Sequence, residues 1–192
     1  MQKSAATFWK NALYPDLLKG KSNNRKIAYI ALLSALVVVV NIFEFKLADT
    51  QFSFTLVASA LVGVLIGPIY GFAACFIGDL VGFLQNSGGF MYMPWIGISL
   101  GLTSFISGCV YHGIKDNGKK QVEYGKLLLV CLLSFFLCTI AINTTAFWVL
   151  YSKVDYFTYL VSRMIIQGQV WNCLVNYALF ILITPVLKRL PL

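Results

Sequence analysis

Long apolar stretches separated by short polar segments run along most of the chain. They lie at residues 26–44, 54–67, 69–87, 91–113, 126–150 and 159–187. A helix needs roughly 20 apolar residues to cross a bilayer, so the pattern predicts an all-α integral membrane protein with a bundle of six transmembrane helices. The second stretch is short and ends at Gly67-Pro68, which predicts a tight hairpin between the second and third helices at residues 67–71.

Composition supports the same class. Hydrophobic residues make up 59% of the 192 residues and charged residues only 11%, whereas a soluble domain carries about 25% charged residues. A soluble core of this size cannot bury so much apolar surface. We therefore expect residues 26–192 to form a single transmembrane domain. Residues 1–25 are polar and basic and lack the features of a signal peptide, so we expect a cytosolic leader, either a short interfacial helix or a tail.

Basic residues are distributed unevenly between the predicted loops. With the N-terminus inside, the outer loops hold only Lys46 and Lys153. The cytosolic segments hold Lys3, Lys10, Lys19, Lys21, Arg25, Lys26, Lys115, Lys119, Lys120, Lys126, Lys188 and Arg189. Lys and Arg favour the cytosolic side, so we expect both termini to be inside. Topology and anionic lipid account for the net charge of +8, and no nucleic-acid partner is expected.

Several polar and aromatic side chains lie near the predicted outer ends of helices three to six. By helix rise they converge on the outer third of the bundle, which predicts a binding site for a flat or amide-bearing organic acid. The predicted substrate-binding residues are Arg163, Trp95, Tyr92, Asn143, Gln85, Ser99 and Gln167. Arg163 would grip a carboxylate, and residues 86–89 form a glycine-rich loop that could cover the site.

Each of these residues also has an alternative role. Arg163 could extend to the outer interface, Trp95 and Tyr92 could belong to the interfacial aromatic belt, and Asn143 could bond a neighbouring helix. Asp79 lies deeper, near the predicted midplane, and we interpret it as a structural partner in helix packing.

Small residues recur at four-residue spacing. Ala31 and Ala35 form one face of an otherwise Leu-, Val- and Ile-rich first helix, as expected of a peripheral helix that offers this face to another protein. For the glycine pairs we favour packing inside the bundle. These pairs are Gly63/Gly67, Gly67/Gly71, Gly78/Gly82 and Gly97/Gly101.

The sequence offers little for catalysis or cofactor binding. The five cysteines lie inside apolar runs without metal-ligand spacing, His112 stands alone, and no phosphate-binding loop is present. We therefore expect no enzyme, no metal and no cofactor bound by this chain, and interpret it as a binding subunit whose energy comes from elsewhere. Two other classes stay open: a small membrane enzyme acting on lipids through Asp79 or His112, and a structural or assembly protein.

Several motifs together resemble a known family. They are residues 60–71 (ALVGVLIGPIYG), 78–82 (GDLVG), 143–148 (NTTAFW) and 162–163 (SR), with the Ala31-xxx-Ala35 pattern. The chain is thereby similar to the substrate-binding S components of energy-coupling factor (ECF) vitamin transporters, in the folate-type branch, which includes pantothenate-type members.

The resemblance implies capture of a vitamin at the bacterial plasma membrane, with folate as the lead and pantothenate or another B vitamin as the alternative. It also implies docking, through Ala31 and Ala35, on a transmembrane coupling protein that works with two cytosolic ATPases.

Overall fold

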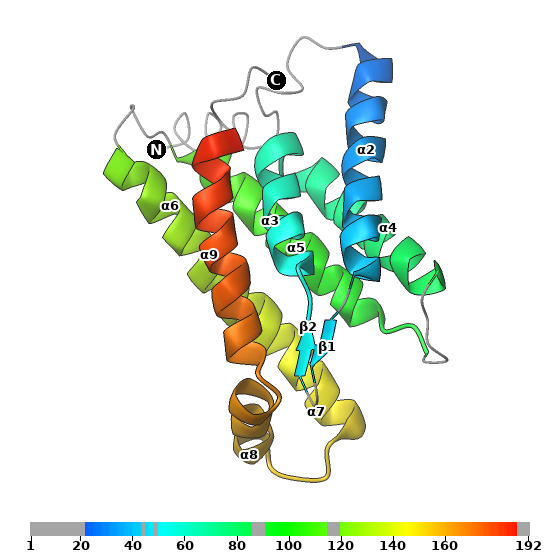
Figure 1. Cartoon of the computed structure of the whole chain (residues 1–192), viewed down its shortest axis with the longest axis vertical. Coiled ribbons are helices and arrows are strands. Elements are labelled where there is room, and N and C mark those ends of the chain that lie inside the picture. The colour runs from blue at the N-terminus through cyan, green and yellow to red at the C-terminus, as the bar shows by residue number, and fades with distance from the viewer. Residues whose placement is uncertain (1–21, 44, 48–49, 86–90, 115–119, 188–192) are drawn as a thin grey trace, which may run out of the picture.

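The computed structural model describes residues 22–43, 45–47, 50–85, 91–114 and 120–187, with the backbone alone for 45–47 and 50–52 (Figure 1). The predicted leader (1–25, apart from its last four residues) and the predicted covering loop (86–89) lie outside these residues. The elements are α2 (Asn23–Ile42), β1 (Phe45–Leu47), β2 (Thr50–Phe52), α3 (Thr55–Ile66), α4 (Pro68–Gln85), α5 (Pro94–Gly113), α6 (Lys120–Leu133), the π-helix η1 (Ser134–Thr144), α7 (Thr145–Tyr151), α8 (Tyr156–Val161), the π-helix η2 (Ser162–Ile166) and α9 (Gln169–Leu187).

Five helices in the described ranges are long and apolar enough to cross a membrane. They are α2, α4, α5, α9 and the continuous 32-residue helix formed by α6, η1 and α7. The sixth predicted helix, α3, is apolar but has only 12 residues, fewer than the roughly 20 that a span needs. A helical, multi-span membrane fold is therefore confirmed, whereas a count of six spans stays a prediction.

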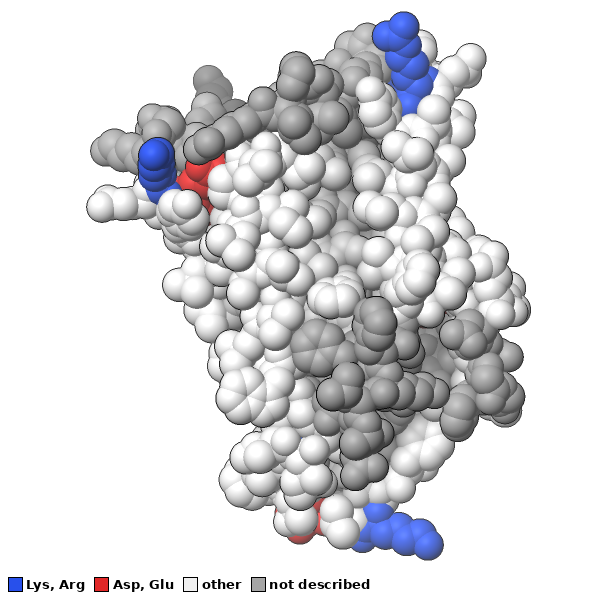
Figure 2. Space-filling model, in the orientation of Figure 1, with Lys and Arg blue, Asp and Glu red and all other residues white. Residues whose placement is uncertain are grey.

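The bundle has two ends (Figure 1). We call one the basic end, because α2 and α6 begin there with Arg25, Lys26 and Lys120. The other is the hairpin end, where β1 and β2 pair antiparallel with Lys46 opposite Gln51 and where Lys153 lies between α7 and α8. On the face in Figure 2, charged side chains of the described residues lie only at these two ends. An uncharged band between two charged ends is what a bilayer requires.

Helix α3 lies at the centre of the bundle, which explains its composition. It contacts α2, α4, α5 and α9, and nearly all its residues are buried. A helix that is apolar on every side is expected in such a position. Gly63 lets α5 approach α3 closely, because an added Cβ there would collide with the Ser104 carbonyl of α5. The predicted role of the glycine pairs in internal packing is confirmed at this contact.

The hairpin between α3 and α4 is as tight as predicted. Only Gly67 separates the two helices, and its φ of 82° is in the left-handed region that glycine tolerates best. Pro68 then begins α4. This arrangement leaves the Val64 carbonyl without its usual donor, because the residue four positions later is a proline and has no N–H. His112 Nε2, from the end of α5, lies 2.6 Å from that carbonyl oxygen instead.

His112→Ala is expected to lower the free energy of unfolding by about 1–3 kcal/mol, since it leaves the buried Val64 carbonyl unpaired. Chemical denaturation of the detergent-solubilised protein measures this change. His112→Gln, which keeps a side-chain donor, should recover part of the loss. An unchanged unfolding free energy in His112→Ala would contradict this role.

The last predicted stretch, 159–187, is not one continuous helix. The α8–η2 segment ends at Ile166, and α9 begins at Gln169 after Gly168, whose φ is 69°. Gly168 allows this break because it has no Cβ to clash in the left-handed region. Arg163 therefore lies on a different helical segment from the residues of α9.

Candidate ligand-binding site

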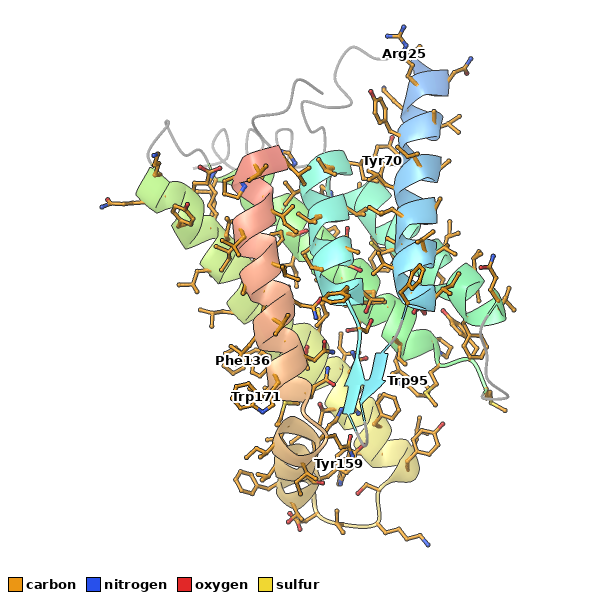
Figure 3. All side chains as sticks on the ribbon, in the orientation of Figure 1. Arg25, Tyr70, Trp95, Phe136, Tyr159 and Trp171 are labelled. Atoms are coloured by element: carbon orange, nitrogen blue, oxygen red, sulfur yellow. The ribbon has the colours of Figure 1, made fainter. Side chains whose placement is uncertain are left out.

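Five side chains from four elements meet toward the hairpin end of the bundle. We call them the polar cluster: Trp95 and Ser99 of α5, Asn143 of η1, Phe147 of α7 and Arg163 of η2. Figure 3 labels Trp95 near the β1–β2 hairpin, and Tyr159, one turn before Arg163, near α8. The sequence predicted four of these five residues as binding residues.

Hydrogen bonds and ring contacts hold the polar cluster together. Asn143 Nδ2 donates to Ser99 Oγ at 3.0 Å, and Ser99 Oγ donates to the Cys138 carbonyl at 3.3 Å. The rings of Trp95 and Phe147 meet edge to face, with centroids 5.9 Å apart. The Arg163 guanidinium carbon lies 4.1 Å from the centre of the Phe147 ring, a cation–π contact that fixes the position of the charge.

Three buried atoms of this cluster lack a hydrogen-bond partner among the described residues. They are the donors Trp95 Nε1 and Arg163 Nε and the acceptor Asn143 Oδ1. An unpaired buried polar group costs about 1–3 kcal/mol, so native proteins rarely leave several together. Two donors and one acceptor around an aromatic ring are the groups that a polar, flat ligand would satisfy.

The Arg163 charge also lacks an acidic partner in the part of the chain that the structure describes. Asp79 accepts from Asn41 and Tyr92, and Asp155 caps the first turn of α8 by accepting from the Thr158 N–H. Glu123 lies on α6 near the basic end. A guanidinium that lies over the Phe147 ring and has an unpaired Nε among the described residues is suited to a carboxylate.

Two π-helical segments place the polar residues. Asn143 lies on η1 and Arg163 on η2. In η1, Thr144 Oγ1 donates to the Thr139 carbonyl at 2.8 Å, five residues back, which matches the π-helical spacing. Short π-helical insertions are rare and are often found at functional sites. The apolar pattern of the sequence predicts regular α-helix here and does not reveal either segment.

The structure does not bring the other predicted binding residues into the cluster. Gln85 is exposed at the end of α4, and Gln167 is exposed directly after η2, before the break at Gly168. Tyr92 donates to Asp79 at 3.3 Å, which is in keeping with the structural role predicted for Asp79. Phe147 was missed, although its spacing of four residues from Asn143 indicates a shared side of the helix.

The polar cluster contains groups that can bind a ligand by hydrogen bonds, charge and ring stacking. It combines an amide, an indole N–H, a guanidinium and aromatic rings, while His112 lies at the far end of α5 against the Val64 carbonyl. No group of three metal-ligating side chains is present within the described residues.

Comparison with known proteins identifies the fold and the family of the chain. A solved structure described as "Crystal structure of FolT bound with folic acid" is similar over 88% of this chain and 95% of that chain, with a TM-score of 0.67 and 23% sequence identity. At this identity the likeness shows a shared fold. No curated protein matches the chain.

A family model described as "ECF-type riboflavin transporter, S component" matches residues 21–191, nearly the whole chain. The prediction of an S component is thereby confirmed, and the family is one of transporter components rather than enzymes. The chain belongs to the ECF-type riboflavin transporter S component family.

Proposed function

We propose that this chain captures folate outside the cell as the S component of an ATP-dependent importer in the bacterial plasma membrane. The observation that carries the proposal is the guanidinium of Arg163, which is held against Phe147 and whose Nε has no hydrogen-bond partner among the described residues. Folate combines a flat fused ring, which suits the aromatic side chains, with carboxylates, which suit the guanidinium.

Riboflavin is the second candidate, because the matching family model carries its name. Its ring is also flat, but the molecule has no negative charge at neutral pH and would leave the Arg163 charge unpaired. Pantothenate has a carboxylate and no aromatic ring, so it would leave Trp95 and Phe147 without a stacking partner. Folate is the vitamin of the three that uses both parts of the polar cluster.

Direct binding to the purified, detergent-solubilised protein tests the proposal. Folate, riboflavin and pantothenate are titrated separately by calorimetry, and folate is expected to bind most tightly. Tighter binding of riboflavin would overturn the choice of vitamin and keep the S-component role. Binding of none of the B vitamins would contradict the proposed function.

Trp95→Ala is expected to weaken folate binding by about 1–3 kcal/mol, because a flat ring loses an aromatic neighbour. Folate should also quench tryptophan fluorescence in the wild-type protein and quench it less in Trp95→Phe. Trp171→Phe is the matched control, since Trp171 is 65% exposed on α9. Equal quenching in the wild type and Trp95→Phe would move the ligand away from Trp95.

For transport, we propose that α2 docks on a transmembrane coupling protein that works with two cytosolic ATPases. Only 11% of the α2 span is buried inside the bundle, against 28% to 50% for the other four spans, and Ala31 and Ala35 are exposed on it. Small residues let a partner helix approach closely in lipid. The basic end would face the cytosol, with both termini inside, in keeping with the positive-inside rule.

The alternative of a lipid-acting enzyme has less support. An enzyme of this kind would use Asp79 or His112. Asp79 instead accepts hydrogen bonds from Asn41 and Tyr92, and His112 lies against the Val64 carbonyl.

A further inference from the structure

A buried carboxyl group connects two helices with the segment that precedes a third. Asp79 of α4 is 6% exposed. Its Oδ1 accepts from Asn41 Nδ2 of α2 at 3.2 Å, and its Oδ2 accepts from the Tyr92 hydroxyl at 3.3 Å. Tyr92 lies two residues before the start of α5. Each carboxyl oxygen thus has a donor from a different segment, and we call the three residues the Asp79 bridge.

Two glycines make room for this bridge. A Cβ at Gly82 of α4 would lie 2.8 Å from Asn41 Nδ2, and a Cβ at Gly97 of α5 would lie 2.8 Å from the Tyr92 hydroxyl. Any larger residue at either position would displace a member of the bridge. The Phe83 ring, whose centroid is 5.2 Å from that of Tyr92, packs against the tyrosine from α4. Gly82 thus leaves space for Asn41, and Gly97 and Phe83 together hold Tyr92.

Tyr92 lies just before the start of α5. Met93 is the N-cap of α5, its carbonyl accepts from the Ile96 N–H at 3.0 Å, and Pro94 is the first helical residue. Trp95, with its unpaired Nε1, follows directly in this first turn. Only Met93 and Pro94 lie between Tyr92 and Trp95, so the position of Tyr92 is coupled through a short segment to that of Trp95.

Asn41 links the same point to α2. It lies in the last turn of α2, ten residues after Ala31 and on the helix that carries the exposed alanine face. Neither Asn41 nor Asp79 belongs to the polar cluster. Of the hydrogen bonds that Asp79 accepts, the one from Tyr92 leads toward that cluster.

We infer that Asp79 and Asn41 are positioning residues for the vitamin site: through Tyr92 they hold the first turn of α5, and with it Trp95, in the geometry that binds ligand. The inference rests on the proposed function for its ligand. It goes further by assigning affinity to residues on α2 and α4 that do not touch the polar cluster.

A double-mutant cycle tests the bridge. Tyr92→Phe removes only the hydroxyl, and Asn41→Ala removes only the donor from α2. Each is expected to weaken folate binding by about three- to tenfold, the scale of one hydrogen bond. Because both act through Asp79, their effects should not multiply in the double variant, and neither should weaken binding further in an Asp79→Ala background. Tyr124→Phe and Asn24→Ala, at exposed positions, are the matched controls.

Hydrogen exchange of the ligand-free protein separates this inference from the proposed function. Tyr92→Phe should speed amide exchange at residues 92–97, and Asn41→Ala should do the same there although it lies on another helix. If the wild-type protein does not bind folate, the proposed function is overturned. The change in amide exchange can be measured in that case too, because it needs no ligand. Unchanged exchange at residues 92–97, affinities within twofold of the wild type, or fully multiplicative effects would each overturn the bridge.

Discussion

Arg163→Ala is expected to weaken folate binding by about 10- to 150-fold, which corresponds to about 1.5–3 kcal/mol. The substitution removes the guanidinium above Phe147 and its unpaired Nε, and a charge-assisted bond to a carboxylate contributes on this scale. Calorimetric titration of the purified variant measures the loss.

Two controls define the cause. Arg163→Lys keeps the charge but loses the planar group that lies over Phe147, so it should recover only part of the affinity. Lys153→Ala removes an exposed charge between α7 and α8 and should leave binding unchanged. Wild-type affinity in a folded Arg163→Ala variant would show that this arginine extends to the interface instead, the alternative that the sequence left open.

Ala31→Trp and Ala35→Trp are expected to abolish vitamin uptake in cells that also express the coupling protein and the ATPases. Both alanines are exposed on α2, so an indole there would keep a partner helix from close approach. Vitamin binding by the isolated variants should stay near the wild-type level, because the polar cluster draws no residue from α2. Uptake is measured with labelled vitamin and binding with purified protein.

Ala178→Trp is the matched control for this experiment. Ala178 is also exposed, but on α9, at a distance from α2 in the bundle (Figure 1). It should leave uptake intact. Uptake that survives both α2 substitutions would exclude this face as the docking surface. Parallel loss of binding and uptake would show that the alanines serve the stability of the chain itself.

The sequence was informative wherever hydrophobicity decides the outcome. The apolar stretches correspond to the helices because lipid requires every backbone polar group to be bonded within a helix. Gly67-Pro68 predicted the α3–α4 hairpin because these residues end one helix and begin the next. The peripheral place of α2 followed from small residues confined to one side of an otherwise lipophilic helix.

Local helix geometry could not be predicted in the same way. The residues of η1 are as compatible with an α-helix as with a π-helix, so the orientation of Asn143 depends on packing rather than on composition. Gly168 inside an apolar run is compatible with a continuous helix, and only the fold shows that it ends one. The three-residue strands β1 and β2 are too short to give an alternating pattern. Tyr92 was predicted to lie near the ligand from its position at the outer end of its helix. Position along a helix does not show which side chain on a neighbouring helix, here Asp79, lies beside it.

The π-helical segment has a consequence for comparing chains of this family. Each N–H in a π-helix bonds the carbonyl five residues back rather than four. Removal of the extra residue of a π-helical turn between 134 and 144 would let that turn return to α geometry, while the α-helical residues on either side would keep their register. The side chains within the turn would change direction, so Asn143 of η1 could no longer face Ser99 as it does here. Two relatives with the same residue types in this helix but lengths that differ by one would present different walls to a vitamin, so helix length must be matched before their specificities are compared.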